Sequence, residues 1–359
     1  MRVYNFSAGP AMMPLEVITE AQAELPDWQG GMSVMEVSHR GKPFVECAAQ
    51  TELALRQVMG IPDNYRVLFL QGGAMGQFAA VPYNLAAPGD RADFVLTGSW
   101  GVKARKEATK LGLDAQVVAD EKESGYTRTP ARGSFAPGPG ARYLHYTPNE
   151  TIGGVEFGYL PDTGDVPLVA DASSTILSRP VDVSRYGVIY AGTQKNMGPA
   201  GMAVVIVRDD LLDQARPDTP SIWHWRAQAD ADSMLNTPPT FSIYLLGKIL
   251  AWVERNGGLE GMAERNRAKA EMLYGFIDES GFYSNPVAPD SRSWMNVPFL
   301  LANPELDKKF VAEAAAQGLS TLAGHRSVGG MRASIYNAMP IAGVAALVDF
   351  MKEFQRING

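Results

Sequence analysis

The chain has 359 residues, of which 46% are apolar and 20% are charged. These fractions are ordinary for a globular protein with a sizeable core and exclude a disordered chain, and the length suggests about two domains. The formal net charge of −7 argues against a nucleic-acid partner, because binding to a phosphate backbone usually needs a basic face.

Targeting and metal-binding signals are weak. The N-terminal residues MRVYNFSAGPAMMP contain no apolar segment of the signal-peptide kind, and no apolar run is long enough to span a membrane. A single cysteine, Cys47, fits a reducing cytosol, and we expect it to fill space in the core. The four histidines lack metal-ligand spacing: His39, His145, His224 and His325. We therefore expect a cytoplasmic protein with no metal and no membrane contact, in which His145 and His224 are packed or surface residues.

Strand and helix patterns alternate through the first 210 residues, after an irregular N-terminal arm. The expected elements are a helix over 46–59, a strand over 65–70, a helix entered from the glycines at 72–76, a strand over 93–96, a helix over 100–111, and strands near 141–146, 168–170, 186–190 and 202–207. Continuous apolar strands that alternate with helices predict an α/β fold with a mainly parallel sheet, covered by helices on both faces.

A break at Asn256-Gly257-Gly258 follows an amphipathic stretch over 240–254. Beyond it we expect a helix over 259–277, a strand over 295–301, a helix over 305–317, a strand over 331–336 and a last helix from Ile341. The chain is thus predicted to comprise an arm (1–14), a large domain (15–256) and a small C-terminal α+β domain (257–359).

Candidate functional residues follow the predicted strands, because ligands of open α/β sheets bind beyond the carboxyl ends of the strands. The glycine-rich GGAMGQ follows YRVLFL, Trp100 follows DFVLTGS, Asp171 follows PLVA, and Lys195 follows YGVIYAG. Each has a simpler explanation: a structural turn, a packed tryptophan, a helix-capping carboxylate and an exposed hairpin lysine.

Taken together, these four features supply the parts that hold pyridoxal phosphate. The start of a helix offers N–H groups to the phosphate, and an aromatic ring stacks on the pyridine. A strand-end carboxylate keeps the ring nitrogen protonated, and a desolvated lysine forms the Schiff base. A dinucleotide-binding fold is disfavoured, because the glycines lack GxGxxG spacing and no acidic residue follows at the expected offset.

Longer strings strengthen this interpretation through a resemblance to a known family. NFSAGPAMMP, MEVSHRGK, HYTPNETIGG, ADASSTILSRPVDVSRYGVIYAGTQKNMGPAG, NTPPTFSIYLLG and GHRSVGGMRASIYNAMP resemble phosphoserine aminotransferases, which are class V, fold type I pyridoxal-phosphate enzymes. The similarity extends from Tyr4 nearly to the C-terminus. It implies a large domain with a mainly parallel sheet of the seven-stranded type, and a homodimer whose subunits share the active sites.

The resemblance also implies a reaction. Such an enzyme transfers an amino group between L-glutamate and 3-phosphohydroxypyruvate, with ping-pong kinetics, to give O-phospho-L-serine and 2-oxoglutarate in serine biosynthesis. Use of 4-phosphohydroxythreonine in pyridoxal phosphate (pyridoxine) biosynthesis stays open.

Residue roles are carried over by motif. Lys195 corresponds to the Schiff-base lysine, Asp171 to the partner of the ring nitrogen and Trp100 to the stacking residue. Further implied cofactor contacts are Ala74, Met75, Thr151 and Gln194, with Asn236 and Thr237 reaching the phosphate from the other subunit. The implied substrate anion contacts are His39, Arg40, His325, Arg326 and Arg332. Some family members have an arginine where this chain has Met75, so a cationic substrate contact is missing there.

Rival interpretations are weaker. A cysteine desulfurase of the same fold would need a cysteine in a mobile loop, whereas Cys47 falls in a predicted helix. Another class V enzyme remains an alternative. A non-enzymatic anion-binding or nucleotide-binding protein would explain the glycines and arginines, but it would leave Lys195 and Asp171 without a role.

Overall fold

A seven-stranded sheet forms the centre of the computed structural model, which describes residues 2–359. In sheet order its strands are β2 (Tyr65–Gln71), β10 (Met202–Arg208), β9 (Val188–Gly192), β8 (Leu168–Asp171), β5 (Leu144–Tyr146), β3 (Arg91–Leu96) and β4 (Asp114–Asp120). The strands from β9 to β4 are parallel, whereas β10 runs antiparallel to both of its neighbours. The predicted mainly parallel sheet is confirmed.

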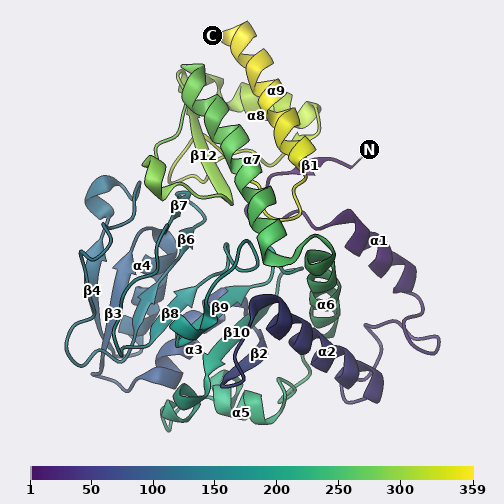
Figure 1. Ribbon diagram of the computed structural model, residues 1–359, viewed down its shortest axis with the longest axis vertical. Helices are drawn as coiled ribbons and strands as arrows, with labels where there is room; N and C mark the ends of the chain where they lie inside the picture. Colours follow the sequence, from purple (N-terminus) through teal and green to yellow (C-terminus); the bar gives the residue numbers. More distant parts are fainter. Residues whose placement is uncertain (1) are drawn as a thin grey trace.

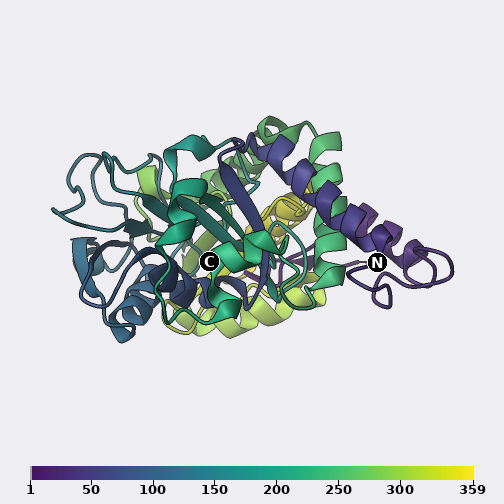
Figure 2. The same cartoon turned by 90° about the horizontal axis from the view of Figure 1, so that it is seen from below.

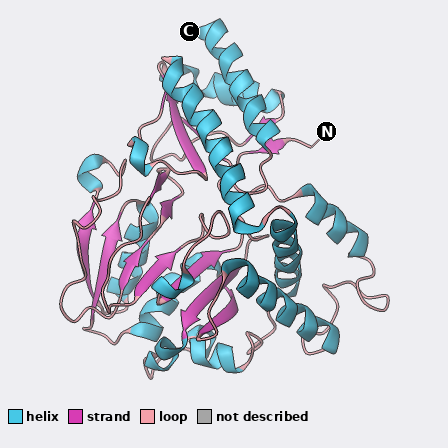
Figure 3. Cartoon of the chain, viewed as in Figure 1, coloured by secondary structure: helices cyan, strands magenta, loops and turns pink. Residues whose placement is uncertain are grey.

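Helices cover both faces of this sheet (Figure 3). The covering helices are α3 (Gly73–Leu85) and α4 (Ser99–Lys110) on one face, and α2 (Lys42–Met59) and α6 (Thr240–Arg255) on the other. Strand β9 shows why both faces of the sheet are apolar. Its Val188 and Tyr190 side chains pack in the core beneath α3 and α4, and the alternating Ile189 and Ala191 pack in the core beneath α2 and α6. Figures 1 and 2 both show α2 crossing α6 at the edge of the molecule.

The C-terminal part of the chain has its own core and an antiparallel sheet of three strands. Its elements are β11 (Tyr283–Ser284), β12 (Asn296–Leu301) and β14 (Met331–Ser334), with helices α7 (Gly258–Ser280), α8 (Asp307–Ala316) and α9 (Ile341–Asn358). The N-terminal strand β1 (Tyr4–Asn5) pairs with β13 (Leu319–Ser320), and Phe6 is buried in the same core. Both termini therefore lie at this end of the molecule (Figure 1).

The elements that the sequence analysis did not predict include α1 (Leu15–Glu24), β4 and the short helix α5 (Trp225–Asp230). Helix α1 buries only Val17 and Ala21, so its apolar pattern is short. Strand β4 lies at the sheet edge and carries polar residues at three of its seven positions, including both ends (DAQVVAD), which weakens the strand signal. Helix α2 begins at Lys42, four residues before the predicted start at Glu46, because Pro43 is tolerated in the first turn of a helix, where its missing N–H has no acceptor to lose. Between residues 2 and 359, no helix is both long and apolar enough to cross a bilayer.

Candidate active site

A cavity of about 380 Å³ opens at the carboxyl ends of the parallel strands. Strands β2, β3, β5, β8 and β9 each contribute lining residues at or just beyond their ends. Seven residues that the sequence implicates line it together: Ala74, Met75, Trp100, Thr151, Asp171, Gln194 and Lys195. The topology rule that directed attention to strand ends thus finds one shared site.

Lys195 lies in the turn between β9 and the antiparallel strand β10. Hydrogen bonds within the turn and to neighbouring segments hold it in place. The Thr193 hydroxyl donates to Pro199 O at 2.5 Å, and the Asn196 amide donates to Ile176 O at 2.9 Å. The Asn196 oxygen accepts the backbone N–H of Asn337 at 3.1 Å, which ties the turn to the C-terminal part. Lys195 is therefore held on rigid surroundings rather than on a free hairpin loop.

The Lys195 amine points at the Thr151 hydroxyl, with which it forms a hydrogen bond. Burial lowers the pKa of this amine to about 8, although the nearby Asp171 and Glu150 carboxyls oppose that shift. A lysine with such a pKa is partly neutral close to physiological pH. It can then act as a nucleophile and as a base.

Asp171 ends β8 with its side chain only 4% exposed. Its Oδ1 atom accepts the hydroxyl of Ser173 at 2.6 Å and the Ser173 backbone N–H at 3.1 Å. Burial raises the pKa of Asp171, and these two donors oppose the rise. No hydrogen bond within residues 2–359 engages Oδ2, so one oxygen of the cavity-lining carboxyl can receive a ligand donor.

The start of α3 forms another wall of the cavity. Gly72 precedes the helix at φ +89°, a left-handed conformation that suits glycine. The N–H groups of the first turn, which contains Ala74 and Met75, have no acceptor within the helix, and the helix dipole favours an anion there. The Met75 side chain is 59% exposed. It brings no cation to the cavity, whereas its backbone N–H is unaffected by the side-chain type.

Trp100 lies in the first turn of α4, which neighbours α3, and Glu150 holds its backbone. The Glu150 carboxyl accepts the N–H of Trp100 at 3.0 and 3.1 Å and that of Gly101 at 2.8 Å. The Glu150 side chain is completely buried, and burial raises its pKa to about 7. The chain segment that carries Glu150, β6 (Asn149–Glu150), therefore connects α4 to the cavity.

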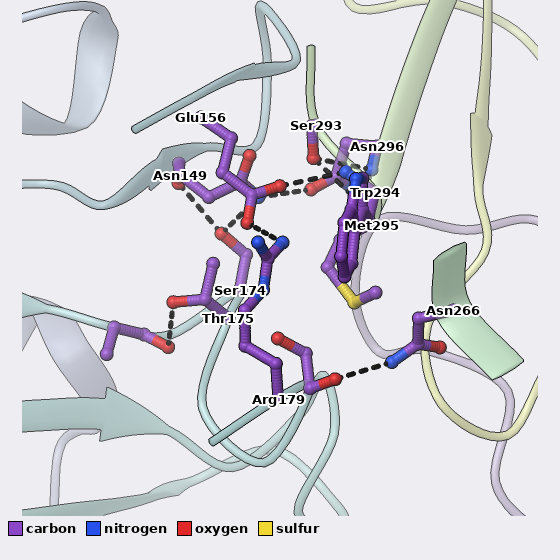
Figure 4. A network of polar contacts seen from close by, with 12 residues as sticks. Asn149, Glu156, Ser174, Thr175, Arg179, Asn266, Ser293, Trp294, Met295 and Asn296 are labelled. Atoms are coloured by element: carbon purple, nitrogen blue, oxygen red, sulfur yellow. Dashed lines mark hydrogen bonds and ion pairs between the residues drawn. The ribbon is translucent and has the colours of Figure 1, made fainter. Parts of the chain in front are cut away.

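Figure 4 shows how this segment is joined to the C-terminal part of the chain. The Asn149 amide donates to Ser174 Oγ and to Asn296 Oδ1, both at 2.8 Å. In the adjoining strand β7 (Val155–Glu156), Glu156 accepts the N–H of Trp294 at 2.8 Å and pairs with Arg179. The cavity wall and β12 are thus fixed relative to each other by buried polar contacts.

The residues predicted to bind substrate anions, and the two predicted to reach the cofactor from the other subunit, do not line the cavity. Arg332 adjoins the cavity, because its Nη1 atom lies 3.4 Å from Thr151 O. Within residues 2–359, the cavity lining excludes Arg332 and the remaining predicted contacts: His39, Arg40, Asn236, Thr237, His325 and Arg326. Asn236 and Thr237 instead accept hydrogen bonds from Gln71, at 3.0 and 3.1 Å. Their proposed roles need either a second chain or movement of these loops.

Cavity-lining residues that the sequence analysis did not single out include Thr147, Asn149 and Ser173. Thr147 directly follows β5, Asn149 begins β6 three residues beyond β5, and Ser173 lies two residues beyond β8. The strand-end signal was therefore present for all of them. It was missed because threonine, asparagine and serine at such positions also commonly form turns.

Two other predictions concern residues outside the cavity. His145 is 2% exposed and its Nε2 lies 2.7 Å from the Tyr190 hydroxyl, so it is packed as expected. Cys47 lies in α2, partly buried against the core, also as expected.

Comparisons with known proteins agree with this geometry. A family model described as Aminotransferase class-V matches residues 3–347. A phosphoserine aminotransferase of Azotobacter vinelandii is 55% identical over 359 residues, which are 100% of this chain and 99% of that protein.

Solved structures agree as well. The phosphoserine aminotransferase from Bacillus circulans subsp. alkalophilus superposes with a TM-score of 0.98 at 48% identity, over 100% of this chain and 99% of that one. A PLP-bound phosphoserine aminotransferase from Trichomonas vaginalis gives 0.93 at 42% identity, over 98% and 100% of the two chains. The chain therefore belongs to the class V aminotransferase family and, within it, to the phosphoserine aminotransferases.

Proposed function

We propose that this chain transfers an amino group between L-glutamate and 3-phosphohydroxypyruvate with pyridoxal phosphate as its cofactor, and so serves serine biosynthesis. The observation that carries the proposal is the convergence of the Lys195 amine, the Asp171 carboxyl and the first turn of α3 on one cavity. The similarity to phosphoserine aminotransferases over the whole chain supports the choice of substrates.

The residues present fit this cofactor. Three polar atoms of cavity-lining residues are buried without a hydrogen-bond partner among residues 2–359: Trp100 Nε1, Thr147 Oγ1 and Asn149 Oδ1. Because buried polar atoms are normally paired, a polar ligand is expected to complete them. A volume of about 380 Å³ suits a small cofactor and a substrate side by side.

Each protein group has a task that its surroundings support. The first turn of α3 would bind the cofactor phosphate, Trp100 would stack on the ring, and Asp171 would hold the proton on the ring nitrogen. When bound, pyridoxal phosphate supplies an aldehyde for amine exchange and a ring that accepts electrons as the substrate Cα loses its proton. The Lys195 amine would take that Cα proton, because its lowered pKa leaves it partly neutral.

A cationic group beside the cavity supports a phosphorylated substrate. Arg332 has a buried Nε atom without a partner among residues 2–359. His325 has its pKa lowered by partial burial and by the charges of Arg332, Arg326 and Lys103. Several cationic side chains close together favour a ligand with several negative charges, such as a keto acid that also carries a phosphate.

Dimerisation and a cytoplasmic location are part of the same proposal. Many of the large apolar side chains exposed on this chain fall within residues 15–53, among them Leu15, Met32, Met35 and Leu53, which are 47% to 59% exposed. Such exposure along one segment is typical of a surface that a partner covers. A second copy of the chain there would agree with Asn236 and Thr237 acting on the other subunit's cofactor, as the resemblance implies.

An absorbance spectrum of the purified holoenzyme tests the function. We expect a visible band from bound cofactor that disappears with L-glutamate and returns with 3-phosphohydroxypyruvate. Pyruvate, which lacks the phosphate, is the matched control and should restore the band far more slowly. Adding 4-phosphohydroxythreonine in place of glutamate tests the second amino donor.

Different failures have different meanings. A band that glutamate removes but 3-phosphohydroxypyruvate does not restore would keep the aminotransferase and reject the phosphorylated substrate. Absence of any band, even after pyridoxal phosphate is added, would reject the cofactor and return Lys195 to a structural lysine.

A further inference from the structure

Glu150 caps helix α4 from a distant part of the sequence. Helix α4 begins at Ser99, its N-cap residue is Gly98, and no local side chain caps it. Capping residues are normally serine, threonine, aspartate or asparagine directly at the helix start. Here the acceptor comes from β6, about fifty residues away, and it takes the N–H groups of Trp100 and Gly101.

Gly98 leaves room for this contact because it has no side chain. A Cβ atom at position 98 would lie 2.5 Å from Glu150 Cδ and 2.7 Å from Glu150 Oε2, well inside contact distance. Every ordinary capping side chain is therefore excluded from the N-cap by the presence of Glu150. Because Gly98 has no side chain, the Glu150 carboxyl can reach the N–H groups at the start of α4.

A cap for helix stability alone would not need this arrangement. A serine or asparagine at position 98 would cap the helix without burying an ionisable group, which is costly. The residues on either side of Glu150, Asn149 and Thr151, both line the cavity, and Thr151 binds the Lys195 amine. Glu150 therefore joins the backbone of the stacking residue Trp100 to the segment that contacts the lysine.

The Trp100 side chain has few other restraints. It is only partly buried, its Nε1 atom has no partner among residues 2–359, and its ring contacts Phe78 at a centroid distance of 6.5 Å and the exposed Lys103 at 4.1 Å. The position of the indole thus depends largely on where the first turn of α4 is held. Small displacements of a ligand-contacting group are costly in a preorganised site.

We propose that Glu150 is a positioning residue, whose carboxyl fixes the first turn of α4 and thereby places the Trp100 indole against the bound cofactor ring. This inference rests on the proposed function, since it assumes that Trp100 stacks on pyridoxal phosphate. Glu150 itself does not line the cavity, so it acts through Trp100.

A double-mutant cycle measures this dependence. Equilibrium dialysis gives the dissociation constant of pyridoxal phosphate for the wild-type chain, Glu150→Gln, Trp100→Ala and the double variant. Glutamine retains one carbonyl acceptor, so Glu150→Gln is the mild variant, and Glu150→Ala is measured where it folds. We expect Glu150→Ala to weaken binding by about 10-fold, the usual effect of losing a residue that orients a ligand contact, and Glu150→Gln by less. In the Trp100→Ala background, Glu150→Gln should change binding by under about 2-fold.

Glu156→Gln is the matched control. Glu156 is also a buried glutamate that accepts a backbone N–H, but its donor is Trp294, at 2.8 Å, which does not line the cavity as Trp100 does. Both glutamine variants should lose thermal stability, whereas only Glu150→Gln should weaken cofactor binding.

The outcomes separate the two claims. Equal losses of affinity from Glu150→Gln with and without Trp100 would overturn the inference while leaving the proposed function intact. Unchanged affinity in Glu150→Gln and Glu150→Ala would overturn it as well. A wild-type chain that binds no pyridoxal phosphate would overturn both.

Discussion

Lys195 is partly buried and Lys269 is fully buried, and their surroundings give the two amines different properties. The Lys195 amine has one hydroxyl partner and lines a cavity. The Lys269 amine is completely enclosed and donates to three carbonyls, those of Ile335, Tyr336 and Met339, at 2.8, 2.7 and 3.0 Å. Burial lowers the pKa of both amines. Three carbonyl acceptors nevertheless require three N–H donors, so Lys269 is an ammonium, whereas Lys195 can lose its proton and react.

The reactivity of Lys195 predicts the pH dependence of cofactor uptake. Only the neutral amine attacks an aldehyde, and the pKa of Lys195 is about 8. The rate at which the apoprotein acquires the visible band should therefore rise about 10-fold per pH unit below that pKa and level off above it. Stopped-flow absorbance between pH 6 and 10 measures the rate. A rate that keeps rising to pH 10, as for an ordinary lysine, would contradict the lowered pKa; Lys195→Arg is the control that should form no band.

At the scale of elements, helix α7 fixes the connection between β14 and α9. Lys269 projects from this helix into the turn at residues 335–339, and Asn266, one turn earlier, donates to Asn337 Oδ1 at 2.8 Å. The same turn carries the Asn337 N–H that holds Asn196 beside the reactive lysine. A helix of the C-terminal part thus supports the active-site turn of the large sheet.

Replacing Lys269 by methionine tests this support. Lys269→Met should lower the free energy of unfolding by at least about 3 kcal/mol, because three buried carbonyls lose their donor. Urea unfolding followed by circular dichroism measures the change. Arg267→Met, on the exposed surface of the same helix, is the control and should stay within about 0.5 kcal/mol of wild type. A Lys269→Met variant as stable as this control would show that the ammonium is not a support.

At the scale of the whole molecule, several residues proposed for the site lie outside the cavity of their own chain. Asn236 and Thr237 are exposed and do not line the cavity of their own chain, and neither does Arg40. The proposal therefore assigns Asn236 and Thr237 to the cofactor site of a partner subunit, whereas Lys195 and Asp171 line the cavity of their own chain.

Mixed dimers test whether these contacts cross between subunits. One chain carries Lys195→Ala, and the other carries Asn236→Ala with Thr237→Ala; the two are co-expressed with different tags. A mixed dimer then has one site with every wild-type residue. Random pairing of two otherwise inactive chains should restore roughly a quarter of wild-type activity. Mixed dimers that form but are no more active than the separate variants would reject the shared site and place all of these residues in one chain.

How much of this could be predicted depends on how local the signal was. The alternation of apolar strands and helices determined the α/β class, because period and turn residues are local properties. The strand-end rule located Trp100, Asp171 and Lys195, because parallel strands bring their carboxyl ends to one edge. Long motif strings determined the family, since they specify many positions at once.

The tertiary structure alone decided which groups meet. Glu150 caps a helix about fifty residues away, and Asn196 bonds to Asn337 across the two cores. These contacts depend on the sheet order β9-β8-β5-β3 and on the docking of the C-terminal part, which no local pattern encodes. The lowered pKa of Lys195 likewise follows from burial among residues distant in sequence. The sequence could therefore identify Lys195 as a candidate, but only the tertiary structure explains why its amine is reactive.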